Sequence, residues 1–150
     1  MDLGQPAGDL LELVSLVVRG VSDNRDLSLT AAAALASLDR RGPQRITAMA
    51  AAEGVSQPSM TQLVQRLEQR GLVARTSDPA DGRVALVSLT DEGMAALAAR
   101  RQRNTTRVAG LLAGLPEDDV AALAGALAAV LPAIRDRVGG QAVVAGVTAS

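Results

Sequence analysis

Apolar and polar residues between positions 45 and 93 follow a helical period first and a strand-like pattern afterwards. A short apolar helix is expected to end at Gly54, and Ser56 is placed to accept a hydrogen bond from the first turn of the next helix. Pro58 is located in that turn, where its missing N–H costs nothing. The apolar residues of this second helix are spaced i, i+3, i+4 and i+7: Met60, Leu63, Val64 and Leu67. The spacing predicts one buried face.

The residues after this helix predict a two-stranded hairpin. Gly71 is a candidate left-handed C-cap, and residues 72–75 have the composition of a strand. Residues 77–83 are dense in turn formers, and residues 84–88 form a second expected strand. A hairpin directly behind a helix-turn-helix is a wing, and Arg83 at its tip is suited to a DNA minor groove.

Two helices are expected before this region. The first follows a frayed lead-in, residues 1–8, and runs from a cap at Asp9 to about Val21. Its apolar face is wider than one partner helix normally covers, which indicates an oligomerisation helix; burial within the same chain is the alternative. The second helix is alanine-rich and is expected to run from a cap at Thr30 to about Arg40.

Two more helices are expected after the hairpin. Thr90 is the candidate N-cap of the first. Pro116 opens the second, whose helical period continues to Val138. Pro132 lies inside this helix and is expected to kink or break it. Residues 139–150 show no helical period, which predicts a loose tail.

These elements predict a mainly α-helical fold with a small β-hairpin wing, of the α+β class. The expected architecture is a winged helix-turn-helix joined to a helical dimerisation domain. An N-terminal dimerisation helix is expected in residues 1–26 and the DNA-binding domain in residues 27–89. C-terminal dimerisation helices are expected in residues 90–138, followed by a flexible tail in residues 139–150.

The composition excludes most enzyme chemistry. The chain has no His, Cys, Phe, Tyr or Trp, and all 15 basic residues are arginine. A thiol nucleophile, a Ser–His–Asp triad and an ordinary zinc site are therefore unavailable. Asp78 and Asp81 form a conceivable catalytic carboxylate pair, but both flank a turn, where aspartate favours local backbone hydrogen bonds. We expect no enzymatic activity, no metal and no cofactor.

Charge is unevenly distributed along the chain. The net charge is −1, yet the segment from Arg40 to Arg83 contains seven arginines and four acids and carries +3. A phosphate backbone responds to such a local basic patch and not to the net charge. Chance scatter of charges is the alternative. We find no signal peptide and no apolar run long enough to cross a bilayer, so a cytoplasmic protein without a membrane partner is expected.

Four motifs in this order resemble the MarR family of dimeric transcriptional regulators. They are residues 54–59 (GVSQPS), 63–73 (LVQRLEQRGLV), 78–83 (DPADGR) and 89–93 (LTDEG). The resemblance implies a homodimer that binds double-stranded DNA at a pseudo-palindromic operator, and a short strand near Gln44. It also implies repression released by a small effector, although some members are activators.

The candidate DNA-binding residues lie on the second helix of the helix-turn-helix and on its flanks. They are Arg45, Ser56, Gln57, Ser59, Thr61, Gln62, Gln65, Arg66, Arg75, Asp81 and Arg83. Gln62 and Gln65 are the expected base readers, because glutamine can pair with adenine. Phosphate contacts are expected from Thr61, Arg66 and Arg75. Asp81 is expected to hold Arg83 or a neighbouring arginine. An exposed polar helix face without a ligand is the alternative for this surface.

Base preference and effector class follow in part from composition. Many members of the family carry arginine at the position of Gln62, so a different base preference is expected here. Without aromatic residues the chain cannot stack on a phenolic ligand, which favours an aliphatic site with arginine for an anionic group. Two other functions stay open: a winged helix that contacts protein, and a regulator without an effector.

Overall fold

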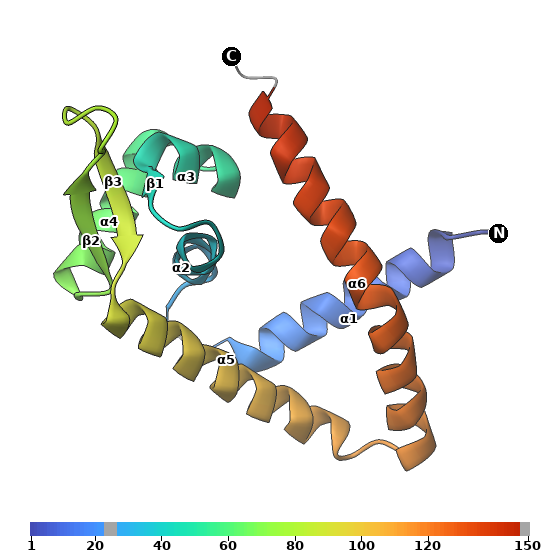
Figure 1. The fold of residues 1–150 in the computed structure, drawn as a ribbon. Coiled ribbons are helices and arrows are strands. Elements are labelled where there is room, and N and C mark those ends of the chain that lie inside the picture. Colours follow the sequence, from blue (N-terminus) through green and yellow to red (C-terminus); the bar gives the residue numbers. More distant parts are fainter. Residues whose placement is uncertain (23–26, 148–150) are drawn as a thin grey trace. The chain divides into compact units, whose positions relative to one another are not determined.

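The computed structural model describes residues 1–22 and 27–147, the last nine of these by their backbone only. The chain forms two units, Met1–Val108 and Ala109–Ser150. Its elements in order are α1 (Gly4–Val21), α2 (Leu29–Arg41), β1 (Gln44–Arg45), α3 (Ile46–Glu53), α4 (Gln57–Gln69), β2 (Val73–Ser77), β3 (Ala85–Leu89), α5 (Asp91–Leu112) and α6 (Glu117–Val147) (Figure 1). The predicted mainly helical fold with a wing is confirmed.

The wing is a three-stranded antiparallel sheet in the order β1-β3-β2. Val73 pairs with Leu89 at one end of the β2–β3 hairpin, and Gln44 pairs with Val87 across to β1. Val87 is fully buried on the central strand. The expected hairpin and the short strand near Gln44 are both confirmed.

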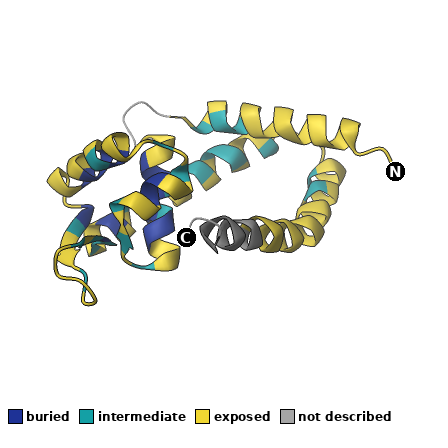
Figure 2. Cartoon of the chain, turned by 90° about the horizontal axis from the view of Figure 1, so that it is seen from above, coloured by how far each residue is buried: buried dark blue, intermediate teal, exposed yellow. Residues whose placement is uncertain are grey.

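The core of the first unit lies between the helices α2, α3 and α4 and the sheet (Figure 2). Its largest fully buried side chains are Leu35, Met49, Met60, Val64, Leu67 and Val87. Burial of each such side chain contributes about 1.5–3 kcal/mol, so a core without aromatic residues still holds the helix-turn-helix together. The four residues of the predicted apolar stripe of α4 are all buried.

Local signals set the turn between α3 and α4. Gly54 ends α3 with φ 63° and ψ 31°, a left-handed conformation that glycine adopts without strain. The Ser56 hydroxyl then accepts a hydrogen bond from the Ser59 amide at 3.3 Å, and Pro58 lies in the first turn of α4. These three predictions are confirmed, and together they fix where the exposed face of α4 begins.

The prediction for the start of α1 is wrong. The helix begins at Gly4, and residues 4–8 of the expected lead-in are helical. The Asp2 carboxylate accepts a hydrogen bond from the Gly4 amide at 2.9 Å, and Pro6 fits the first turn because its missing N–H would have no partner there. Asp9 lies inside the helix and accepts a hydrogen bond from Gln5 Nε2 at 2.8 Å.

The N-cap of α2 is Ser28, so the prediction of Thr30 as the cap is wrong. Ser28 Oγ accepts a hydrogen bond from the Ala31 amide at 3.1 Å. Serine and threonine are both good caps, and the chain has one at each of these two positions, so composition alone could not decide between them. Residues 23–26, part of the predicted polar break, lie outside the described residues.

The first turn of α5 is joined to the turn that ends α4. Thr90 Oγ1 accepts a hydrogen bond from the Gly93 amide at 3.0 Å, which confirms Thr90 as a cap, and it donates one to the Gly71 carbonyl at 2.6 Å. The Thr90 amide also donates to the Leu72 carbonyl at 3.2 Å. Gly71 has φ 72°, as expected for its left-handed position. These bonds fix the end of α4 to the start of α5.

The helix α6 is longer than the sequence predicts. It continues through Pro132 without an interruption in its assignment and ends at Val147, beyond the expected end at Val138. The predicted loose tail is therefore helical in its backbone up to Val147. Extending an existing helix needs no new nucleation, so a segment without helical period can still continue it. Residues 148–150 lie outside the described residues.

Both α1 and α6 expose apolar side chains. None of the residues of α1 is buried, and its exposed apolar residues are Leu10, Leu11, Leu13, Val14 and Leu16. Those of α6 are Leu127, Val130, Leu131, Ile134 and Val138. No helix among the described residues is long and apolar enough to cross a membrane.

Candidate nucleic-acid interface

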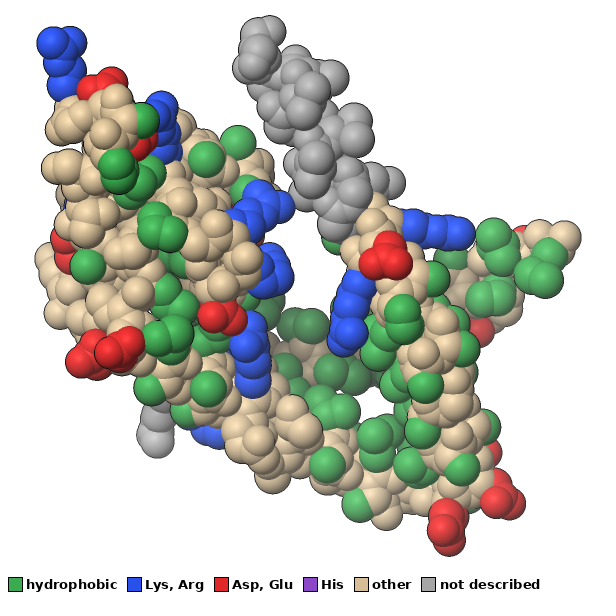
Figure 3. All heavy atoms as spheres, in the orientation of Figure 1, with side chains coloured by type: hydrophobic (Ala, Val, Ile, Leu, Met, Phe, Trp, Pro, Cys, Tyr) green, Lys and Arg blue, Asp and Glu red, His purple; other side chains and the backbone are tan. Residues whose placement is uncertain are grey.

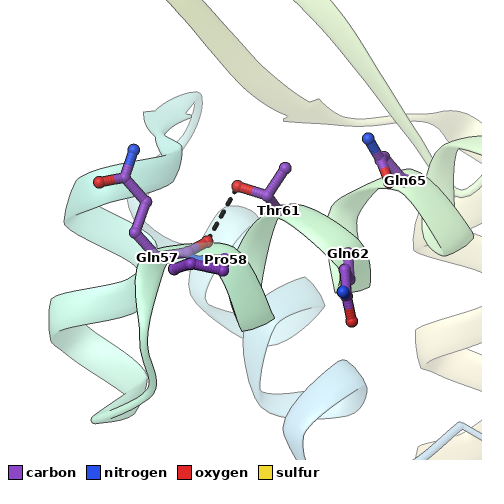
Figure 4. Close-up of a pocket in the computed structure, with 5 residues that line it drawn as sticks. All are labelled: Gln57, Pro58, Thr61, Gln62 and Gln65. Atoms are coloured by element: carbon purple, nitrogen blue, oxygen red, sulfur yellow. Dashed lines mark hydrogen bonds between the residues drawn. The ribbon is translucent and has the colours of Figure 1, made fainter.

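The helix α4 presents a polar surface that the core does not use. A shallow, open hollow of about 430 Å³ lies along this face (Figure 4). It is lined by Gln57, Pro58, Thr61, Gln62 and Gln65. Four of these five residues were chosen from the sequence, and the structure brings them together on one helix. Amides and hydroxyls can donate and accept hydrogen bonds, as the edges of base pairs require.

The side chains along α4 point to two sides of the exposed face. Gln57, Thr61 and Gln65 lie on one side, whereas Gln62 points away from them (Figure 4). Thr61 Oγ1 donates a hydrogen bond to the Gln57 carbonyl at 2.9 Å. A phosphate contact of Thr61 would have to redirect this hydroxyl proton. The three glutamine residues are exposed.

Ser56 and Ser59 serve the start of α4. Ser56 Oγ caps the helix, and the two hydroxyl oxygens lie 2.8 Å apart in a shared hydrogen bond. Their first role is thus to hold the helix-turn-helix in shape. Both side chains remain exposed, so each keeps lone pairs for a ligand.

Two of the predicted arginines are paired with acids. Arg45 Nη2 lies 2.7 Å from Asp78 Oδ2, and Arg75 Nε lies 3.2 Å from Glu68 Oε2. Both pairs are partly exposed, and exposed pairs contribute at most about 1 kcal/mol. A phosphate can therefore compete for either guanidinium. Glu68 and Asp78 could not be predicted as partners of these arginines, because neither pair has a short-range signal in the sequence.

The loop of the wing is shaped by two aspartates and carries one arginine. Asp78 Oδ1 accepts a hydrogen bond from the Ala80 amide at 2.9 Å, and Asp81 Oδ1 accepts one from the Arg83 amide at 3.1 Å. Asp81 was expected to hold Arg83 or a neighbouring arginine, and it contacts the backbone amide of Arg83. Arg83 is exposed, and a basic side chain projects at the hairpin tip (Figure 3).

The charges of the segment from Arg40 to Arg83 favour an anion. Within the described part of the chain, five exposed arginines between residues 40 and 83 form no ion pair: Arg40, Arg41, Arg66, Arg70 and Arg83. The described residues contain no group of three or more acids that could hold a metal ion. The arrangement is suited to binding a polyanion through cations and reading it through amides.

The pKa of Asp78 gives a test of the wing geometry. The hydrogen bond from the Ala80 amide, followed by that from Arg45, lowers this pKa below its ordinary value of 3.8. A lowered folded-state pKa contributes stability above pH 3.8, and this contribution is lost as the pH falls through the folded-state pKa. We expect a carboxyl NMR titration of Asp78 to give a midpoint below 3.8. Arg45→Gln should raise that midpoint, and a midpoint at or above 3.8 in the parent would contradict the geometry.

Comparisons with known proteins find a family model and several transcriptional regulators. The model of the MarR family matches residues 27–85. The chain is 36% identical over 89 residues to the uncharacterized HTH-type transcriptional regulator Mb0904 of Mycobacterium bovis, covering 59% of this chain and 62% of that protein. It is 42% identical over 59 residues to the HTH-type transcriptional repressor MdtR of Bacillus subtilis, covering 39% of this chain and 38% of that one. The chain thus spans less than two thirds of these relatives.

The fold is similar to solved structures over nearly the whole chain. The crystal structure of the transcriptional regulator Tm0710 from Thermotoga maritima matches with a TM-score of 0.73 and 26% identity. The match covers 91% of this chain and 98% of that one. The structural similarity therefore includes residues of both units, whereas the family model matches only residues 27–85.

Proposed function

We propose that this chain, which belongs to the MarR family of winged helix-turn-helix transcriptional regulators, is a homodimer that binds double-stranded DNA. The observation that carries the proposal is the exposed amide face of α4, followed directly by a wing. The arginine at the tip of this wing forms no ion pair with another described residue. Neither the glutamine side chains of α4 nor Arg83 belongs to the hydrophobic core. The relatives that the chain matches are named as transcriptional regulators, which supports a regulator as the function.

Each recognition helix is proposed to enter a major groove. Gln62 and Gln65 meet base edges there, and Arg66 and Arg75 meet phosphates. Arg83 on the wing reaches the adjacent minor groove. Two copies related by a two-fold axis then read a pseudo-palindromic operator, with half-sites one or more helical turns apart. Hydroxyl-radical footprinting tests this directly: two symmetric protected segments are expected, and a single protected segment would contradict a dimer.

The dimer is proposed from the apolar faces of α1 and α6. Monomeric soluble proteins rarely expose contiguous apolar patches of this kind, and each unit has one. A second copy of the chain is the partner that would cover both. Light scattering is expected to give twice the mass of one chain. Ile134→Glu, which places a charge in the exposed face of α6, should shift the mass towards that of one chain.

Regulation is proposed to be repression that a small anionic or apolar effector relieves. The similarity to a protein named as a repressor supports the mode of action. By linkage, the effector weakens DNA binding only if it binds the conformation that DNA disfavours. We expect at least one aliphatic or anionic compound in a thermal-shift screen to raise the melting temperature and to lower DNA affinity. A screen in which nothing moves the melting temperature would support a regulator without an effector.

Gln62→Ala is expected to change the preference for particular DNA sequences more than it changes the salt dependence of DNA binding. A glutamine paired bidentately with a base contributes about 1–3 kcal/mol of discrimination, and it carries no charge to release counterions. Binding to duplexes that differ at single base pairs should show relaxed preference at one position of each half-site. The salt dependence should stay as in the parent. Unchanged preference would show that α4 is seated differently in the groove.

A protein-interaction module is the second candidate function. It is disfavoured because the exposed face of α4 carries no acid before Glu68 and because Arg83 projects from the wing. Such a module would not discriminate between duplexes. The footprinting experiment therefore separates the two functions.

A further inference from the structure

A second, smaller hollow lies on the flank of α4, next to the start of α2. It measures about 230 Å³ and is lined by Ser28, Thr30, Val55, Ser59, Leu63 and Arg66. The lining combines three hydroxyls and one guanidinium with two apolar side chains, and it contains no acid. Ser28 caps α2, so the hydroxyl of Thr30 is not used as the cap.

Two of the polar groups in this hollow are already used. Ser28 Oγ caps α2, and Ser59 Oγ shares a hydrogen bond with Ser56. The Thr30 hydroxyl and the Arg66 guanidinium form no hydrogen bond or ion pair with any other described residue, and both side chains are exposed. The hollow thus offers a permanent positive charge and a hydroxyl donor from two different helices. An anion with several acceptor oxygens satisfies both.

The position of Arg66 indicates which anion this is. Arg66 lies one helical turn after Gln62, so the two residues are neighbours on the surface of α4. With Gln62 at the base edges of a major groove, the phosphates of one strand run along the flank of the helix. The hollow lies on that flank.

We propose that this hollow holds one phosphate of the DNA backbone, bound jointly by Thr30 of α2 and Arg66 of α4. The inference rests on the proposed DNA-binding function and extends it to a residue outside the helix-turn-helix and the wing. A phosphate held by two helices fixes how α4 is rotated in the groove. Thr30 is therefore a positioning residue that carries no sequence information itself.

Arg66 is charged and Thr30 is not, so the salt dependence of DNA binding distinguishes their contributions to affinity. Arg66→Gln should lower DNA affinity and reduce the salt slope by about one unit per protomer, because one cation no longer replaces counterions. Thr30→Val removes a hydroxyl of the same shape and should lower affinity about threefold to tenfold without a change in slope. The double variant should lose less than the product of the two factors, since both groups hold the same phosphate.

Matched variants control for folding and for general charge. Thr30→Ser keeps the hydroxyl and should retain the affinity of the parent. Arg41→Gln removes the same charge at the opposite end of α2 and should have a smaller effect than Arg66→Gln. All variants should unfold at the same temperature as the parent, because both side chains in the hollow are exposed.

A methylphosphonate scan of a bound duplex locates the phosphate. Neutralising one particular phosphate in each half-site should lower the DNA affinity of the parent. The same substitution should not change the DNA affinity of the Thr30→Val, Arg66→Gln double variant. The proposal would be overturned if the parent and the double variant gave identical scans. It would also be overturned if Thr30→Val bound DNA with the affinity of the parent. If inorganic phosphate stabilises the parent and not the double variant while both bind DNA equally, the hollow binds a free anion instead. If the parent binds no duplex, the proposed function itself fails.

Discussion

Gly93→Ala is expected to destabilise the winged domain by about 3 kcal/mol or more, a value at the upper end for overpacking. A Cβ at this position would overlap the carbonyl oxygen of Leu72 and lie 2.7 Å from Leu89 Cδ1. The Leu72 carbonyl is backbone, and it already accepts a hydrogen bond from the Thr90 amide. The first turn of α5 must therefore move away from the end of α4 to make room.

Chemical denaturation of Gly93→Ala and of Gly110→Ala measures this effect. Both glycines lie in α5, but a Cβ at Gly110 meets nothing within 4 Å. Gly110→Ala should be neutral or stabilising by up to about 1 kcal/mol, through helix propensity alone. Equal stability of the two variants would show that the contact between α5 and Leu72 is looser than described. DNA binding by Gly93→Ala should fall as well, because α4 is anchored through the same turn.

Arg83→Ala is expected to weaken binding to every duplex by tenfold or more, which corresponds to about 1.4 kcal/mol. Arg83 is exposed and forms no ion pair with other described residues, so its charge is available to DNA. The Asp81 carboxylate fixes the backbone at the hairpin tip, which limits the conformational entropy lost on binding. The salt slope should also fall by about one unit per protomer.

Anisotropy titrations at moderate salt compare Arg83→Ala with two further variants. Arg83→Lys keeps the charge, so it should have the same salt slope of DNA binding as the parent. It should regain only part of the DNA affinity that Arg83→Ala loses. Arg137→Ala removes the same charge from α6 and should bind DNA as the parent does. If Arg83→Ala also binds as tightly as the parent, the assignment of the hairpin as a DNA-binding wing fails.

The sequence predicts the winged part of the fold well because its signals are local. The cap at Ser56, the left-handed residues Gly54 and Gly71, and the cap at Thr90 each depend on atoms within a few residues. The starts of α1 and α2 were misplaced for a related reason. Where two acceptable caps are close together, small differences in tertiary context select one of them.

The sequence indicates candidate residues for the site, but it does not indicate the contacts among them. The Arg45–Asp78 pair joins residues 33 positions apart, and it depends on the pairing of β1 with β3. The hollow of Thr30 and Arg66 requires the start of α2 to lie against α4. Helix periodicity gives the exposed face of one helix, but it does not show which other element lies beside that face.

The central claim is that α4 and the wing bind DNA specifically as a dimer. Fluorescence anisotropy tests it most directly, with a duplex from immediately upstream of the protein's own coding sequence and a random duplex of equal length. At several salt concentrations, we expect tighter binding to the first duplex and a steep decrease of affinity with salt, with a slope of about −0.9 for each phosphate contacted. Weak binding that does not distinguish the two duplexes even at low salt would contradict the claim and favour a protein partner.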